Sequence, residues 1–370
     1  MKKTLLIIVI LIFSALSYSQ DSTKTVIAPK EGRNNFVVIG NAEMKYFRDV
    51  NSNQYGDIDF KPIFLWSIGK NIFVESEIEI ETGAGDVEVG LEYANMVYRV
   101  NNFLKLRAGR FLPRFGAYRG CYAEGFLNHF STDPTGFGDG GIGAMNEEGI
   151  GAQGEFQLGC SQLNYDVYLS NGPQLLTDSA NAGQFEYEAY TSNNKQFAEG
   201  GRIGFLPFSN SSLEVGYSFQ YKKNTGDVGS INTNAQLQMH AIDFNYFHHF
   251  SGIKSIIRLT GEYKYQKVDH AIYYRPDSTT YTFNDAPSAY YAALSFRPAL
   301  LKNRILRSFE VACRYSMFNR PKDAPWGGSN IEQTAFSLNY WLEWNCLVKL
   351  TYQVQTATPN AFIAQVVFGF

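Results

Sequence analysis

After its first residues, the sequence has no long apolar run. A membrane-crossing helix needs about 20 consecutive apolar residues, and no such segment follows the N-terminus of this 370-residue chain. A helical membrane protein is therefore excluded.

Cysteine and histidine are also scarce, with four and five residues. Neither the CxxC nor the HxxxH spacing of common metal sites occurs, so no metal or other cofactor is expected. An exported chain could oxidise its cysteines, but the sequence leaves the pairing of Cys121, Cys160, Cys313 and Cys346 open. The net charge of -3 argues against a nucleic-acid partner.

The N-terminus has the composition of an export signal. Two lysines precede an apolar run over residues 5–13, and small residues follow near Ser19. We expect a signal peptide over residues 1–19, followed by a short periplasmic lead over residues 20–34. This lead is too short to be the internal plug domain of an energised receptor.

Aromatic residues and glycine are abundant, with 24 Tyr, 29 Phe and 33 Gly. Aromatic residues favour strands, and glycine marks turns. From residue 35 to the end, apolar and polar residues alternate with period two in segments of membrane-strand length, about 10 residues, whereas soluble strands average about 5 or 6. Sixteen such segments are predicted: 35–47, 56–68, 72–82, 86–99, 103–112, 149–159, 161–171, 199–207, 212–222, 235–247, 253–266, 287–297, 305–316, 331–342, 345–355 and 361–370.

The connections between these segments alternate in length. If the first strand runs outward, the periplasmic links are short, as at 69–71 and 343–344, and several outer links are long, as at 113–148 and 172–198. The pattern predicts an all-β protein: a transmembrane antiparallel β-barrel of sixteen strands over residues 35–370, in the outer membrane of a Gram-negative bacterium. Its partners there would be outer-membrane lipid and lipopolysaccharide.

Two details of the strands add to this prediction. Segment 235–247 slips phase near Ala241, which indicates a β-bulge or a wrongly placed strand edge. The last segment ends on Phe370. A final strand that ends in an aromatic residue is similar to the signal read by the barrel-assembly machinery.

The stretch from Leu106 to Gly116, LRAGRFLPRFG, is the most distinctive motif. It resembles the phosphate-selective porin family and its relatives in Bacteroidetes, in which a strand ending in a similar Gly-[Arg/Lys]-Phe…Pro-Phe-Gly leads into the third outer loop. Segments 165–172 and 201–207 and the closing strand also look like that family. The resemblance implies sixteen strands, a homotrimer, and a third outer loop, here 113–148, folded into the pore.

An inward-folded loop narrows the lumen and filters solutes by size and charge. The alternative is an external glycine-rich loop with solvated charges. The constriction-loop candidates are Arg114, Arg119, Asp133, Asp139, Glu147 and Glu148.

The polar faces of the strands predict which charges line the lumen. The pore-lining candidates are Glu75, Glu77, Glu79, Glu81, Lys105, Arg107, Arg202, Lys254, Arg258 and Arg314. This set is mixed and its densest run is acidic, which departs from the anion filter that the family's name implies. Acids on early strands and bases on later ones could form a transverse field, or a wet lumen could tolerate either charge.

We therefore predict a porin that lets small hydrophilic solutes or ions diffuse passively, and not an enzyme. One alternative is a closed barrel whose outer loops bind a surface ligand or partner. Another is an outer-membrane lipase, because Ser218 and His240 lie on neighbouring segments. Ser218 is expected to face the lumen, however, and no motif orients it as a nucleophile.

Overall fold

Sixteen antiparallel strands close into a barrel in which β1 pairs with β20. The computed structural model describes residues 34–82, 85–123, 125–138 and 140–370, so the expected signal peptide lies outside the described residues. The barrel strands are β1 (Asn35–Arg48), β2 (Asn53–Ile68), β3 (Ile72–Thr82), β4 (Val87–Arg99), β5 (Lys105–Phe111), β6 (Glu147–Leu158), β7 (Ser161–Ser170), β10 (Ala198–Leu206), β11 (Leu213–Lys222), β12 (Gln236–Phe250), β13 (Ser255–Asp269), β16 (Ser288–Arg297), β17 (Phe309–Asn319), β18 (Ile331–Glu343), β19 (Cys346–Gln355) and β20 (Ala361–Gly369).

Each of the sixteen predicted segments corresponds to one barrel strand, which confirms the predicted fold class. Several boundaries differ by a few residues, and the start of β17 differs most among the strand starts. Residues 305–308, expected to begin a strand, belong to the short helix α3 (Arg304–Ser308). The side chain of Asn303 caps this helix by accepting hydrogen bonds from the backbone N–H groups of Ile305 and Leu306, which satisfies two donors of the first turn.

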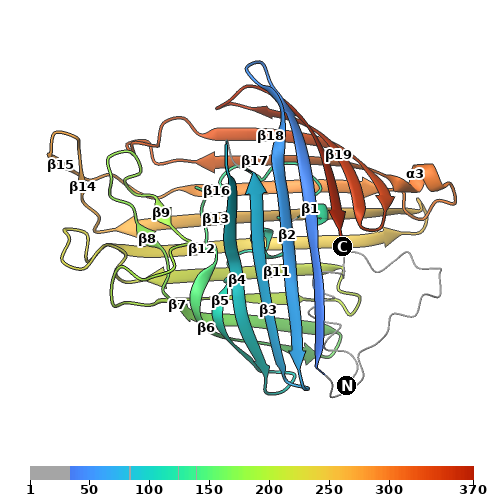
Figure 1. Cartoon of the computed structure of the whole chain (residues 1–370), viewed down its shortest axis with the longest axis horizontal. Helices are drawn as coiled ribbons and strands as arrows, with labels where there is room; N and C mark the ends of the chain where they lie inside the picture. The colour runs from blue at the N-terminus through green and yellow to red at the C-terminus, as the bar shows by residue number, and fades with distance from the viewer. Residues whose placement is uncertain (1–33, 83–84, 124, 139) are drawn as a thin grey trace.

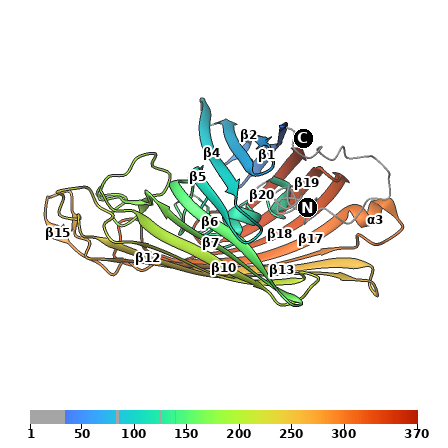
Figure 2. The same ribbon diagram turned by 90° about the horizontal axis from the view of Figure 1, so that it is seen from below.

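The long connections gather at one end of the barrel and the short turns at the other. The long connections carry the two-stranded pairs β8 (Gln174–Leu175) with β9 (Phe185–Glu186) and β14 (Tyr273–Tyr274) with β15 (Thr280–Tyr281). Figures 1 and 2 show these pairs at the opposite end from α3. Since outer loops are long and periplasmic turns are short in barrels of this kind, the end with β8, β9, β14 and β15 is the outer end.

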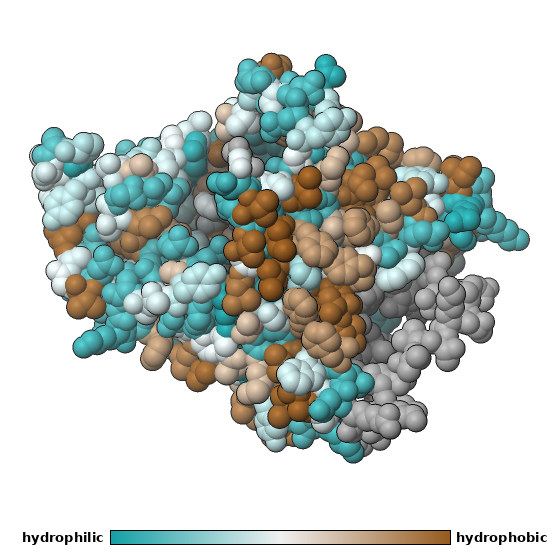
Figure 3. Space-filling view, in the orientation of Figure 1, coloured by the Kyte–Doolittle hydropathy of each residue, from teal (hydrophilic) through white to brown (hydrophobic). Residues whose placement is uncertain are grey.

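The strands present apolar side chains outward and polar side chains inward. On β13, Leu259 and Tyr263 are exposed, whereas Glu262 and Lys264 between and beside them are buried. Figure 3 shows an apolar surface running over β1–β4, where Trp66 is among the exposed residues. An outside that is apolar around a polar interior is stable only when lipid surrounds the barrel.

Aromatic pairs mark the periplasmic edge of the apolar surface. Phe103, Phe156 and Tyr165 form a stack with ring centroids 5.6 and 5.7 Å apart. Phe309 and Tyr340, at the start of β17 and near the end of β18, lie edge to face at 4.9 Å. Such girdles form where a barrel crosses the level of the lipid headgroups.

β12 keeps a continuous register with β13 from Gln236 to Phe250, so no bulge explains its phase slip. The strand extends beyond the predicted end, and its alternation inverts near its outer end. Leu237 and Met239 are fully buried inside the barrel, while His240 is exposed outside. The inversion has a tertiary cause, since Leu237 and Met239 pack against a loop inside the lumen.

The helices are short. The third outer loop contains the four-residue helix α2 (Tyr118–Cys121) and the turn of 3-10 helix η1 (Gly125–Leu127), and α3 has five residues. Within the part of the chain that the structure describes, no helix is long and apolar enough to cross a membrane.

Candidate permeation path beside the third outer loop

The connection between β5 and β6, residues 112–146, folds into the barrel. Its first turn is held by the opposite wall: the backbone N–H of Gly116 donates to Ser218 Oγ at 3.0 Å. The next two N–H groups, of Ala117 and Tyr118, donate to Glu262 Oε2 at 2.9 and 2.8 Å. The expectation of an inward-folded third loop is therefore confirmed.

The middle of the loop is fixed through His129. Its Nδ1 lies 2.6 Å from Glu310 Oε1 on β17, and Arg258 Nη1 on β13 lies 3.1 Å from its Nε2. Because a guanidinium can only donate, Nε2 accepts and Nδ1 carries the proton toward Glu310. The two contacts join the loop to two wall strands.

Two buried cations bind the loop's backbone carbonyls. Arg314 on β17 donates to the carbonyl oxygens of Thr132 and Asp133 at 2.7 and 2.9 Å. Lys349 on β19 donates to those of Gly125 and Phe130 at 2.8 and 3.3 Å. Arg314 was expected to line the pore, but it is 1% exposed and lies beneath the loop.

An apolar cluster fills the lumen between the loop and the wall from β12 to β17. From the loop it contains Phe115, Tyr118, Phe137, Ile142 and Met145, and from the wall Leu237, Met239, Ala289, Tyr291 and Phe318. The ring of Phe137 meets Tyr118 and Tyr291 edge to face at 5.7 and 5.0 Å. These buried side chains close this part of the lumen, so a path for solutes has to run beside the cluster.

Tyr118 belongs to this apolar cluster and also contacts the charged loop residue Asp133. Burial raises the pKa of its hydroxyl well above the ordinary value, and the neighbouring Asp133 raises it further. The hydroxyl therefore stays protonated and donates to Asp133 Oδ1 at 2.7 Å.

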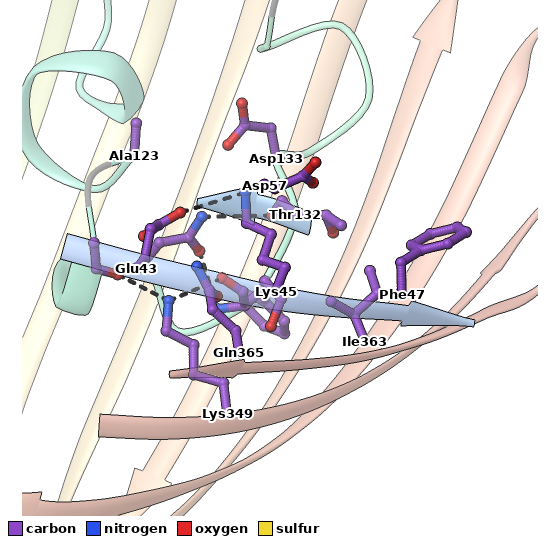
Figure 4. Close-up of a pocket in the computed structure, with 14 residues that line it drawn as sticks. Glu43, Lys45, Phe47, Asp57, Ala123, Thr132, Asp133, Lys349, Ile363 and Gln365 are labelled. Carbon is purple, nitrogen blue, oxygen red and sulfur yellow. Dashed lines mark hydrogen bonds and ion pairs between the residues drawn. The ribbon is translucent and has the colours of Figure 1, made fainter. Parts of the chain in front are cut away.

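A polar cavity of about 320 Å³ lies on the other side of the loop, against β1, β2, β19 and β20. Figure 4 shows Lys45 and Glu43 of β1 in its centre, with Asp133 and Thr132 of the loop on one side and Lys349 on the other. Lys45 and Glu43 form an ion pair at 3.3 Å. Charged groups of both signs therefore meet where the loop faces the first strands.

The glutamate row of β3 stands on the neighbouring wall and faces the lumen. Glu75 accepts a hydrogen bond from Asn95 of β4 at 3.0 Å, and Glu79 forms an ion pair with Lys61 of β2 at 2.5 Å. Glu77, which lies between them in the sequence, is buried, and Glu81 is the most exposed of the four. This acidic face is not covered by the apolar cluster.

The predicted basic residues are mostly engaged. Arg107 pairs with Asp166 at 2.7 Å, and Arg202 pairs with Asp243 at 2.6 Å and Glu214 at 3.0 Å. Lys105 is half-buried on β5. Lys254 was misplaced: it lies exposed in the turn between β12 and β13, because β13 begins only at Ser255.

The predicted constriction residues have different environments. Arg114 is half-buried and has no hydrogen bond or ion pair with another described residue, whereas Arg119 donates to the Met145 sulfur at 2.8 Å. Asp133 accepts from Tyr118. Asp139 lies outside the described residues.

Glu147 and Glu148 begin β6 instead of ending the loop. Glu147 accepts from Gln220 at 2.9 Å and from Ser170, and Glu148 pairs with Arg110 at 2.7 Å. Both carboxylates fasten the base of the loop to the wall.

Glu262, Ser218, Glu310 and Lys349 are anchors that the prediction of site residues did not include, and Glu262 and Ser218 hold the first turn. Both lie at polar, lumen-facing positions of their strands, so the alternation places them on the correct face. Their loop partners are about 100 or more positions away in sequence, at separations of 102, 144 and 145. Only the folded loop identifies them.

Ser218 and His240 lie on opposite faces of the barrel wall. The Ser218 hydroxyl is fully buried against the loop, whereas His240 is exposed outside and its Nδ1 lies 2.8 Å from the Tyr217 hydroxyl. A nucleophile and its base must share a hydrogen bond, so these two residues do not form a catalytic pair.

The fold is that of solved outer-membrane channels. OmpF of Salmonella typhi, in a complex with daunomycin, superposes with a TM-score of 0.60 at 11% identity, over 91% of this chain and 98% of that one. The outer-membrane channel DcaP of Acinetobacter baumannii gives 0.58 at 10% identity, over 92% and 98%. The anion-selective porin from Comamonas acidovorans gives 0.55 at 12% identity, over 91% and 100%.

No family model matches the sequence, and no curated protein matches it. The likeness therefore concerns the fold. Together, the sixteen-stranded closed barrel and its apolar exterior assign the chain to the outer membrane of a Gram-negative bacterium.

Proposed function

We propose that this protein is a porin that lets small hydrophilic solutes or ions cross the outer membrane by passive diffusion. The observation that carries the proposal is the position of the third outer loop. The loop is fixed to the wall from β11 to β19 by hydrogen bonds and an apolar cluster. Its other side faces a polar cavity and the wall of β1–β4.

We propose that the charges along the β3 wall favour cations. Glu75, Glu77, Glu79 and Glu81 form an acidic face on which Glu79 pairs with Lys61, whereas both Arg107 and Arg202 are paired with carboxylates. An acidic lining attracts cations and excludes anions. A phosphate-selective member of the family that the sequence resembles would need basic residues free to meet the solute, so we propose a weakly cation-preferring channel.

Reversal potentials under a salt gradient test this path. We expect purified protein in planar bilayers to give steady conductance steps with a cation preference. The triple substitution Glu75→Gln, Glu77→Gln and Glu79→Gln should lower the permeability ratio of cation to anion by about two- to fivefold, because about 1 kcal/mol of attraction is removed at the path. A matched control is Glu199→Gln, Glu332→Gln and Glu343→Gln, at three exposed positions.

The proposal fails if well-folded protein gives no conductance. If the triple variant and the control give the same reversal potential, the β3 glutamates do not set the ion preference, and only that part of the proposal fails.

We further propose a homotrimer. OmpT, an outer-membrane protein of Vibrio cholerae that is described in a trimer form, has the same fold with a TM-score of 0.52 at 10% identity. The apolar surface over β1–β4 in Figure 3 would supply the contact. Sedimentation in detergent would distinguish a trimer from a monomer.

One observation favours the second candidate, a barrel whose outer loops bind a ligand. A cavity of about 500 Å³ opens among the outer loops and is lined by Ile231, His270, Phe283, Asn284 and Asp285 among others. Its size suits a small molecule. If folded protein gives no conductance in a planar bilayer, ligand binding by the outer loops becomes the proposed function in place of the channel.

A further inference from the structure

The periplasmic rim from β12 to β19 is both basic and apolar. We define the basic rim as the β12–β13 turn with Lys254, the β16–β17 connection with Lys302, Arg304 and Arg307, and the β18–β19 turn with Trp344. Contacts join the three parts. The backbone N–H of Leu300 donates to the Lys254 carbonyl at 3.1 Å, and Arg304 pairs with Glu343 at 3.2 Å.

The apolar side chains of α3 are exposed. None of its five residues is buried, and Ile305 is 61% exposed. Ile253, Leu300, Leu306, Leu342 and Trp344 are also exposed along the rim. Apolar side chains left in water at one place mark a contact surface.

Among the described residues, the charge of the periplasmic turns is one-sided. The periplasmic turns, all within the described residues, contain the basic residues Lys70, Lys254, Lys302, Arg304 and Arg307 and no acidic residue. Glu343, at the end of β18, is the nearest acid and already pairs with Arg304. The rim is therefore positive, and most of its cations have no carboxylate partner among the described residues.

The rim continues the lipid-facing surface. The aromatic pair Phe309 and Tyr340 lies directly beyond α3 on the outward face. The Arg307 carbonyl accepts a hydrogen bond from Arg297 at 3.1 Å, which ties the end of α3 to the wall. In Figures 1 and 2, α3 projects at the edge of the barrel, where the headgroups of the inner leaflet lie when the girdle is at the interface.

We propose that the basic rim binds the phosphate groups of anionic phospholipids in the inner leaflet of the outer membrane. The apolar side chains enter the acyl region, while Lys254, Lys302, Arg304 and Arg307 reach the phosphates, the arrangement of an interfacial anchor. Each basic residue near an anionic lipid surface contributes on the order of fivefold in binding. The rim thereby selects phosphatidylglycerol over a zwitterionic lipid and fixes the depth of the barrel.

Tryptophan quenching by brominated lipid measures this selection, because Trp344 lies in the rim. The protein is reconstituted in phosphatidylcholine vesicles that contain either brominated phosphatidylglycerol or brominated phosphatidylcholine. The signal of Trp344 is the difference between the wild type and Trp344→Phe. We expect several-fold stronger quenching by the brominated phosphatidylglycerol.

The excess is the additional quenching by brominated phosphatidylglycerol over brominated phosphatidylcholine. It should disappear in the rim variant, which carries Lys254→Gln, Lys302→Gln, Arg304→Gln and Arg307→Gln. A matched control carries Lys195→Gln, Lys223→Gln, Arg275→Gln and Lys322→Gln, at four exposed outer-loop positions, and should keep it. Raising NaCl from about 0.1 M to about 1 M shortens the Debye length from about 10 Å to about 3 Å and should weaken the excess in the wild type.

The proposal is overturned if wild-type protein shows no excess, if salt leaves the excess unchanged, or if the control loses as much as the rim variant. The wild-type and salt measurements decide the question even if the rim variant does not fold.

Discussion

At the scale of single residues, the loop depends on a close approach between Gly116 and Glu262. Gly116 has a φ of +72°, and a Cβ there would lie 1.8 Å from Glu262 Oε1. Only glycine allows both the left-handed backbone and this contact. The same carboxylate faces the ammonium group of Lys264 at 3.5 Å.

Replacing Glu262 should release the first turn of the loop. Glu262→Ala removes the acceptor of two backbone N–H groups and leaves the buried Lys264 without its carboxylate, which costs about 3–5 kcal/mol. We expect a lower midpoint of urea unfolding and increased current noise in single-channel records. Glu332→Gln, at an exposed site, is the control. Unchanged stability together with unchanged noise would contradict the assigned anchor.

Asp285 makes the local stability of the outer loops depend on pH. Burial raises the pKa of its carboxyl to about 7, against an ordinary value of 3.8. The carboxyl accepts a hydrogen bond from Tyr273 at 3.2 Å. Between the unfolded and the folded pKa the folded loops bind more protons than the unfolded chain, so local stability falls as pH rises from about 4 to about 7 and then levels off.

Hydrogen exchange of residues 270–287 measures this effect. After correction for the intrinsic rate, protection should decrease from about pH 5 to about pH 7 in the wild type and then level off. Asp285→Asn cannot ionise and should show nearly constant protection. Equal pH dependence in both proteins would assign the titration to another group.

At the scale of elements, β12 shows how one strand serves two environments. Leu237 and Met239, near its outer end, are buried against the loop, while Ile242 is exposed to lipid on the other face. The register with β13 is unbroken through this change. The strand therefore keeps a regular pleat. Near its outer end the inward face also meets an apolar partner, the third outer loop.

Truncations on the two faces of β12 should differ in their effect. Leu237→Ala leaves a cavity in the apolar cluster and should cost about 2–5 kcal/mol in the free energy of unfolding. Ile242→Ala shortens a side chain that lies in lipid and should cost clearly less. Urea titrations of the two variants in the same lipid provide the comparison, and equal losses would mean that the cluster does not stabilise the lumen.

At the scale of the whole molecule, the barrel and its loop have separate roles. The wall is closed by its own backbone hydrogen bonds, from β1 through β20. The loop is then fixed to the wall from β11 to β19, and its apolar cluster does not include the acidic face of β3.

Removing the loop should widen the channel. Replacing residues 118–144 by a short Gly-Ser linker removes most of the apolar cluster's loop side, and we expect single-channel conductance to rise several-fold and cation preference to fall. Shortening 276–279, an exposed stretch between β14 and β15, is the control and should leave conductance unchanged. Conductance that stays constant after loop removal would place the narrowest point elsewhere.

The sequence by itself determined the wall of this protein. Period-two alternation depends only on neighbouring residues, so it predicted sixteen strands, their faces and the glutamate row of β3. The alternation of short and long connections predicted which end is outside. Lys254 and residues 305–308 were misplaced because the ends of strands carry little alternation.

The tertiary structure alone decided what fills the barrel. The anchors Glu262, Glu310, Arg314 and Lys349 are polar lumen positions in the sequence, and nothing local distinguishes an anchor from a pore-lining charge. Their partners lie between 144 and 224 residues away in the loop. The apolar residues of β12 are explained by the same long-range contact. Contacts between distant segments depend on the folded path of the loop, and local patterning does not encode that path.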